Sequence, residues 1–280
     1  MSERLAADVA PRRIGFATAV TLALLAVLIL MALLGPLLVP YDPVATDPPA
    51  ALQPPSAMHL FGTDSLGRDV FSRVVVSARV DLGIALIAVA VTVLIGTALG
   101  AAAGWAGGWT DRIVGRLMDT IMAFPLFVLA VGIAAGLGNS VSSVVIATVI
   151  VNLPLYTRQT RNEVNRRRHS AYIDAARLGG IGALPTVALH LMPNLLPPIA
   201  VQASLNMGWA ILNAAGLSFL GLGIRPPNPE WWIMVSEGAA YIISGEWWLF
   251  AFPGAMLFLA ILTFSLLGDT LRDWLDPRRA

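Results

Sequence analysis

The sequence contains neither cysteine nor lysine, and all 18 of its basic residues are arginine. Without cysteine there can be no disulfide, thiolate nucleophile, iron–sulfur cluster or cysteine-based zinc site. Without lysine the chain lacks both the phosphate-binding lysine of a P-loop and the amine needed for Schiff-base chemistry. We therefore expect that this chain neither hydrolyses ATP nor binds a cofactor of its own.

Charged residues and histidines are also scarce. Only 12% of the 280 residues are charged and 57% are hydrophobic, and the mean hydropathy is +0.74. The three histidines, His59, His169 and His190, do not form the i, i+4 pair with an intervening glutamate that zinc protease helices use. The composition excludes an ordinary soluble domain and indicates an integral membrane protein in a lipid bilayer. A net charge of +1 gives no reason to expect a nucleic-acid partner.

Long apolar runs supply the fold class. A bilayer core about 30 Å thick is crossed by roughly 17–25 mostly apolar helical residues. Runs of this kind cover residues 15–39, 82–104, 117–137, 141–156, 195–222 and 248–268. The sequence therefore predicts an all-α membrane protein with six transmembrane helices. Pro125 and Pro154 lie inside two of the runs and predict kinks there.

The placement of the arginines predicts the orientation, because cytoplasmic loops of membrane proteins carry an excess of positive charge. Six spans place both termini on one side, and a cytoplasmic amino terminus leaves few arginines outside. The inner segments would hold Arg4, Arg12, Arg13, Arg112, Arg116, Arg158, Arg161, Arg166, Arg167, Arg168, Arg177, Arg272, Arg278 and Arg279, and the outer side Arg68, Arg73, Arg79 and Arg225. We therefore expect both termini to be cytoplasmic.

The second run carries a stripe of glycines. Gly96, Gly100, Gly104 and Gly108 recur at every fourth position, on a single face of a helix. Such a ridge lets another helix approach closely. The neighbouring helix could belong to this chain or to a second subunit.

Few polar residues lie within the runs. Arg116 and Asp119 are spaced i, i+3 and are expected to form a structural ion pair. Asn152, Asn206 and Asn213 could line a solute pathway or form hydrogen bonds between helices. An ion-coupled carrier should bury more titratable groups than this, so that class is disfavoured.

A membrane-embedded enzyme would need a cluster of acid–base or metal-binding residues. Asp64, Arg68 and Asp69 form the densest set, and a turn held by ion pairs explains them better than a catalytic site. His59 lies nearby without partners in sequence, and we expect no metal site.

The loop 157–190 is the most informative segment. An arginine-rich stretch ends at Arg168, and residues 170–180 read Ser-Ala-Tyr-Ile-Asp-Ala-Ala-Arg-Leu-Gly-Gly. The glycine pair predicts the end of a short helix, because glycine readily adopts the left-handed conformation that stops one. A small, slightly apolar helix of this kind suits a groove on another protein.

The same loop resembles a family signature. Asp174, Ala175 and Ala176, then Gly180, His190 and Pro193, match the spacing of the EAA loop of permease subunits in binding-protein-dependent ABC importers. Asp174 replaces the usual glutamate, and His190 stands where many members carry an apolar residue.

Three further blocks resemble the dipeptide, oligopeptide and nickel branch of that family, and in particular its second, C-type permease subunit. The blocks are residues 61–69, residues 217–223 with the following Pro226, Pro227 and Trp231, and residues 268–278.

The resemblance implies a type I ABC importer permease fold in the cell inner membrane. It implies an amino-terminal segment with the first helix at residues 1–75, a transmembrane domain at 76–272 whose coupling loop is 157–190, and a cytoplasmic tail at 273–280. Such a subunit pairs with a homologous permease, with two cytoplasmic ATPases that use ATP and Mg, and with an extracytoplasmic solute-binding protein. The coupling loop would carry Asp174, Ala175, Ala176, Gly180, His190 and Pro193. The expected solutes are di- or oligopeptides, with nickel chelates, glutathione and opine-like compounds as alternatives.

Overall fold

Helices make up the regular secondary structure of residues 15–275, the part of the chain that the computed structural model describes. The long helices are α1 (Phe16–Leu38), α2 (Val70–Ala106), α5 (Val141–Arg167), α8 (Leu196–Phe219) and α10 (Trp248–Leu275). The shorter elements are η1 (Pro48–Ala50), α3 (Gly108–Met122), α4 (Leu126–Leu137), α6 (Ala171–Leu178), α7 (Ala183–Pro185), η2 (Thr186–Leu191), η3 (Met192–Asn194) and α9 (Trp231–Ala239). The all-α prediction is confirmed for this part of the chain. Arg4, Arg12, Arg13, Arg278 and Arg279, and with them most of the tail 273–280, lie outside the described residues.

Four helices are long and apolar enough to cross a membrane: α1, α2, α5 and α10. Two further pairs of helices meet the same criterion only when the two members of a pair are counted as one span. These are α3 with α4, bent by 92°, and residues 183–194 with α8, bent by 61°. Length and composition thus give four spans, or six if each bent pair is one span, and the chain is a multi-pass membrane protein.

The bend between α3 and α4 confirms the predicted kink at Pro125 and divides the run 117–137 between two helices. Helix α3 ends at Met122 and α4 begins at Leu126, with Pro125 at the break. Proline has no backbone N–H to donate and disfavours helical geometry in the residue before it, here Phe124. At Pro154, in contrast, α5 continues to Arg167 without a break.

Helix α2 begins at Val70, well before the predicted residue 82. The Asp69 side chain caps it by accepting a hydrogen bond from the Ser72 N–H at 2.8 Å. Arg73 and Asp81 lower the hydropathy of the first turns, yet both side chains are buried. Hydropathy misplaced the start because the charges lie inside the protein rather than in water.

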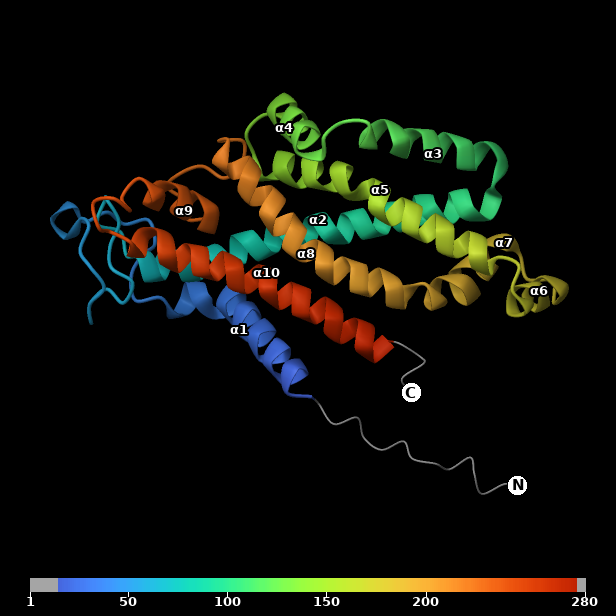
Figure 1. Ribbon diagram of the computed structural model, residues 1–280, viewed down its shortest axis with the longest axis horizontal. Helices are drawn as coiled ribbons and strands as arrows, with labels where there is room; N and C mark the ends of the chain where they lie inside the picture. The colour runs from blue at the N-terminus through green and yellow to red at the C-terminus, as the bar shows by residue number, and fades with distance from the viewer. Residues whose placement is uncertain (1–14, 276–280) are drawn as a thin grey trace, which may run out of the picture.

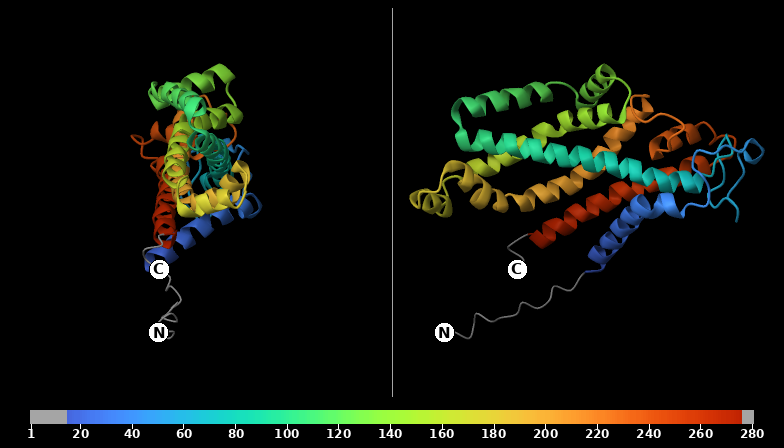
Figure 2. Two further views of the ribbon diagram at one scale, coloured as in Figure 1. Left: turned by 90° about the vertical axis from the view of Figure 1, so that its right-hand side faces the viewer. Right: turned by 180° about the vertical axis from the view of Figure 1, so that it is seen from behind.

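The long helices run between two ends of an elongated molecule (Figure 1). Helix α9, η1 and the 39–69 loop lie at one end, which we call the α9 end. Helices α6 and α7 and the turn from α2 to α3 lie at the other, the α6 end. Helix α1 runs toward the α9 end and α10 runs away from it. Figure 2 shows from behind that α1 lies along one edge of the bundle.

The glycine stripe faces α5 of the same chain. A Cβ atom at Gly96 would lie 2.8 Å from the Tyr156 Cβ, and one at Gly104 would lie 2.8 Å from the Val164 Cβ. A Cβ at Gly100 would meet the Thr157 carbonyl oxygen. The first three glycines therefore bring α2 and α5 into close contact within one subunit, whereas a Cβ at Gly108 would meet open space.

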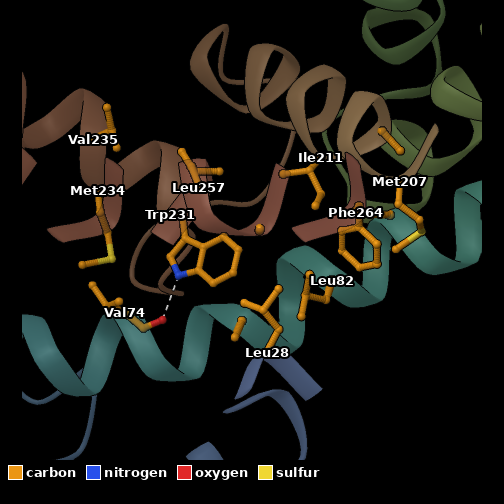
Figure 3. Packing of buried hydrophobic residues seen from close by; sticks show 14 of the residues in the cluster. Leu28, Val74, Leu82, Met207, Ile211, Trp231, Met234, Val235, Leu257 and Phe264 are labelled. Carbon is orange, nitrogen blue, oxygen red and sulfur yellow. Dashed lines mark hydrogen bonds between the residues drawn. The ribbon is translucent and has the colours of Figure 1, made fainter. Parts of the chain in front are cut away.

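The main hydrophobic cluster surrounds Trp231 at the start of α9 (Figure 3). The ring is fully buried, and its Nε1 donates a hydrogen bond to the Val74 carbonyl oxygen of α2 at 2.8 Å. Leu28 of α1, Ile211 of α8 and Leu257 of α10 belong to the same cluster. This cluster thus joins the short α9 to four long helices.

Candidate functional site

Helix α6 is a short helix that follows directly after α5. The Ser170 Oγ donates to the Arg167 carbonyl oxygen at 2.7 Å, just after α5 ends. At the other end, the Ile181 N–H donates to the Ala176 carbonyl oxygen at 3.1 Å, and Gly180 has a φ of 80°. The bond to Ala176 and the positive φ of Gly180 are typical of a glycine-terminated helix. They confirm the predicted helix and its stop.

The two faces of α6 differ in burial. Ile173 is fully buried and Ala176 is 8% exposed, whereas Asp174, Ala175 and Leu178 are exposed. Ile173 joins a small hydrophobic cluster that contains Val164, Leu191, Leu195, Ile199 and Ala101. The helix therefore rests on α2, α5 and α8 through one face and offers the other to its surroundings.

Arg177 fixes α6 to the end of α2. Its guanidinium lies 4.6 Å from the centre of the Trp105 ring, a cation–π arrangement. The same side chain pairs with the Asp174 carboxylate at 3.6 Å. Movement of α6 is thereby linked to the end of the longest helix of the protein.

The chain then returns to α8 through a bent helical segment. Thr186 Oγ1 donates to the Gly182 carbonyl oxygen at 2.8 Å, and Asn194 Nδ2 donates to the His190 carbonyl oxygen at 2.7 Å. His190 is half-buried and Pro193 is exposed. Leu178, Leu184 and Leu189 are 90%, 79% and 70% exposed. The segment 171–194 thus places an exposed apolar surface beside the six residues of the predicted coupling loop.

Two of the three predicted asparagines meet between helices. Asn206 Nδ2 of α8 donates to Asn152 Oδ1 of α5 at 3.0 Å, and Asn152 Nδ2 donates to the Thr148 carbonyl oxygen at 2.7 Å. Asn206 is only 3% exposed, and its Oδ1 is buried without a partner. Asn213 is half-buried on α8. In this conformation Asn152 and Asn206 form a bond between helices.

Asp119 pairs with a different arginine from the one expected. Its carboxylate accepts a hydrogen bond from Arg158 Nη2 of α5 at 2.5 Å, and no ion pair between Arg116 and Asp119 occurs in the described part of the chain. Nearby, both oxygens of Asp111 accept bonds from Arg161. These two pairs join α3 to α5, because the turn at Gly107 and Gly108 folds α3 back along the bundle. A hollow of about 1,080 Å³ lies between the two helices there.

The polar cluster at the α9 end is a turn held by ion pairs. Asp64 Oδ1 accepts bonds from the Leu66 and Arg68 N–H groups, and its Oδ2 accepts from Arg68 Nε at 2.6 Å. Arg73 Nε lies 3.5 Å from the same carboxylate, and His59 Nδ1 lies 2.9 Å from Asp69 Oδ1. Within residues 15–275, no group of three or more His, Cys, Asp or Glu side chains is placed to hold a metal ion.

Sequence reasoning did not pair Asp81 of α2 with Glu230, which precedes α9. Asp81 Oδ2 accepts a bond from the Trp231 N–H at 3.1 Å, and Glu230 caps α9 through the Ile233 N–H at 2.9 Å. Burial raises the pKa of the Glu230 carboxyl above its usual value. No local pattern could have revealed a contact between residues so far apart in the chain.

Comparisons with known proteins agree with this architecture. The family model described as a binding-protein-dependent transport system inner membrane component matches residues 93–280. A model for the N-terminal transmembrane domain of oligopeptide transport permease C matches residues 19–55.

Relatives match almost the whole chain. The probable D,D-dipeptide transport system permease protein DdpC of Escherichia coli is 41% identical over 93% of this chain and 87% of the relative. The dipeptide transport system permease protein DppC of Alkalihalophilus pseudofirmus is 43% identical over 89% of this chain and 82% of the relative. The nickel transport system permease protein NikC of Escherichia coli is 37% identical over 91% and 92%. The chain therefore belongs to the family of inner membrane components of binding-protein-dependent transport systems, as a permease subunit.

Proposed function

We propose that this permease forms one half of the solute pathway of an ATP-driven importer of short peptides. A homologous permease would supply the other half. Two cytoplasmic ATPases would use ATP and Mg, and an extracytoplasmic binding protein would deliver the solute. The peptide assignment is supported by the names of the relatives, most of which are dipeptide or peptide permeases.

The segment 171–194 carries the coupling part of the proposal. Leu178, Leu184 and Leu189 are exposed apolar side chains in a segment whose other face rests on three long helices. An ATPase groove that covers this surface would bury it and could push on α6 when the ATPases close. Because Arg177 and Trp105 join α6 to α2, such a push would reach the bundle.

The orientation follows from the same assignment. We place the α6 end in the cytoplasm and the α9 end outside, and we count each bent helix pair as one span, which gives six spans and the type I fold. The amino-terminal segment would be residues 1–75, the transmembrane domain 76–272 and the tail 273–280. The start of α1 and the end of α10 both lie away from the α9 end (Figure 1). Both would therefore lie toward the cytoplasm. The protein would lie in the cell inner membrane.

The test is ATP-driven uptake in proteoliposomes that contain this chain, the partner permease, the ATPases and the binding protein. A labelled dipeptide and a nickel–histidine chelate would be offered separately. We expect ATP-dependent dipeptide uptake. Nickel uptake alone would keep the mechanism and assign the solute of the NikC relative instead. Uptake that does not depend on ATP would overturn the importer proposal.

Gly180→Trp tests the coupling segment in the same assay. Gly180 has a positive φ, and a Cβ atom there would meet no other atom within 4 Å, so a large side chain would project toward the ATPases. Gly180→Ala is the matched control, since alanine suffers the same backbone strain without the bulk. We expect Gly180→Trp to abolish uptake and Gly180→Ala to retain most of it. Equal uptake by wild type and Gly180→Trp would contradict the coupling role.

A further inference from the structure

A groove lies between α2 and the segment that leads into α8. Its volume is about 660 Å³, within the range of small-molecule sites. The lining side chains are almost all aliphatic, among them Leu94, Ala98, Ala101, Leu184, Val187 and Leu196. One wall is the part of α2 from Val93 to Trp105, and the other wall belongs to α7, η2 and α8. The groove therefore separates a long span from the proposed coupling segment.

The rim of the groove is open. Leu94, Leu184 and Leu196 are 72%, 79% and 57% exposed. Because α2 is long and apolar enough to span a bilayer, this rim lies within reach of lipid chains. Water would be a poor occupant of a site with so few polar partners. A hydrocarbon chain fits both the lining and the opening.

One end of the groove carries aromatic and positive groups. Trp105 lines the groove, and the Arg177 guanidinium lies 4.6 Å from its ring centre. Arg168 Nη1 donates to the carbonyl oxygen of the adjacent Gly104 at 3.0 Å, and no ion pair in the described part of the chain includes Arg168. Tryptophan and arginine at the end of a span are typical of the headgroup layer. Guanidinium groups bind phosphate oxygens well.

We propose that the groove binds one acyl chain of an anionic phospholipid, whose headgroup phosphate is held by Arg177 and Arg168. The leaflet is the one at the α6 end, which is the cytoplasmic leaflet if the proposed function is correct. The bound chain fills the space between α2 and the segment 183–199. It therefore stiffens the connection through which an ATPase would act on the bundle.

Photo-crosslinking tests the site in the assembled, resting transporter. The complex is reconstituted in vesicles that contain phosphatidylglycerol or phosphatidylcholine with the same diazirine in one acyl chain, and labelled peptides are identified by mass spectrometry. We expect labels in residues 93–105 and 183–199, with about five-fold more from phosphatidylglycerol for each arginine that contacts the headgroup.

Three variants separate the parts of the proposal. Ala98→Trp fills the groove and should abolish these labels, whereas Ala90→Trp, at another exposed alanine of α2 that does not line the groove, should leave them unchanged. Arg177→Gln should lower the preference for phosphatidylglycerol about five-fold, and it should reduce labelling by phosphatidylcholine less, because the choline cation offsets the charge of that lipid's phosphate.

The outcomes distinguish this site from the proposed function. Labels that survive Ala98→Trp, or equal labelling by both lipids, would overturn the lipid site. Lipid labels on the second permease, with none on residues 93–105 or 183–199 of this chain, would show that lipid does not enter the groove and would also overturn the proposal. The labelling needs no transport, so a lipid site found without ATP-driven uptake would contradict only the proposed function.

Discussion

The helices at the two ends of the molecule, α9 and α6, are held in different ways. At the α9 end, the buried Arg68 pairs with the half-buried Asp64, and Trp231 ties α9 to the bundle. At the α6 end, α6 rests on the bundle through Ile173 and Ala176, and large apolar side chains point outward. The difference indicates that α9 is fixed to the bundle, whereas α6 leaves one face exposed. Substitutions at buried and at exposed positions of the two ends should therefore have unequal effects.

The largest effect is expected at Trp231. Trp231→Ala removes a fully buried ring and leaves the Val74 carbonyl without its indole partner, so unfolding should become easier by about 4 kcal/mol. Trp247→Ala is the matched control, since that ring is 54% exposed. Thermal unfolding in detergent micelles measures both. A similar melting temperature for the two variants would show that α9 is not anchored as described.

The two faces of α6 give the next contrast. Ile173→Ala should cost about 3 kcal/mol, because the side chain is fully buried among α2, α5 and α8 residues. Leu178→Ala, at a 90% exposed position of the same helix, should change stability by less than about 0.5 kcal/mol. Proteolysis of the segment reports local loosening as well as global unfolding. A larger loss for Leu178→Ala would reverse the assignment of the two faces.

The glycine stripe between α2 and α5 should show a smaller effect. Gly100→Leu forces a side chain against the Thr157 carbonyl of α5 and should destabilise the protein by about 2 kcal/mol. Gly83→Leu, on the same helix, meets open space and should be tolerated. Unfolding of both variants in the same detergent compares them directly. If both glycines accept leucine equally, α2 and α5 do not pack as closely as the structure has them.

The smallest effect concerns pH at the α9 end. The raised pKa of Glu230 means that its protonated form favours the folded state, so this contribution is present at low pH and is lost as the pH rises through the raised value. Asp81→Asn removes the neighbouring acid and keeps an acceptor for the Trp231 N–H. We expect it to add about 1 kcal/mol near pH 7 and to flatten the pH profile.

Melting temperatures from pH 4 to 8 measure this change. Asp47→Asn, at an exposed aspartate, is the control and should leave the profile unchanged. A neutral-pH loss of stability in Asp81→Asn would mean that the two carboxyl groups do not oppose each other.

Composition and motifs predicted the parts of this structure that depend on local sequence. The helical fold, the helix Ala171–Leu178 and its glycine stop follow from hydropathy and capping residues alone. The start of α2 did not, because hydropathy counts Arg73 and Asp81 as exposed. The bond of Asp119 to Arg158 also escaped, since it depends on how α3 turns back on α5. Nothing local revealed the neighbours of Glu230 or the lining of the apolar groove.

The most direct test of the account uses the absence of cysteine from the chain. Leu178→Cys and Ile243→Cys place one thiol in α6 and one at a fully exposed position between α9 and α10. A membrane-impermeant maleimide is added to sealed vesicles of known orientation, with and without the ATPases, and the mass of this chain reports labelling. We predict that Leu178→Cys reacts only from the cytoplasmic side and is protected by the ATPases, whereas Ile243→Cys reacts only from outside and is unaffected. Labelling of both variants from the same side, or of Leu178→Cys equally with and without the ATPases, would contradict the account.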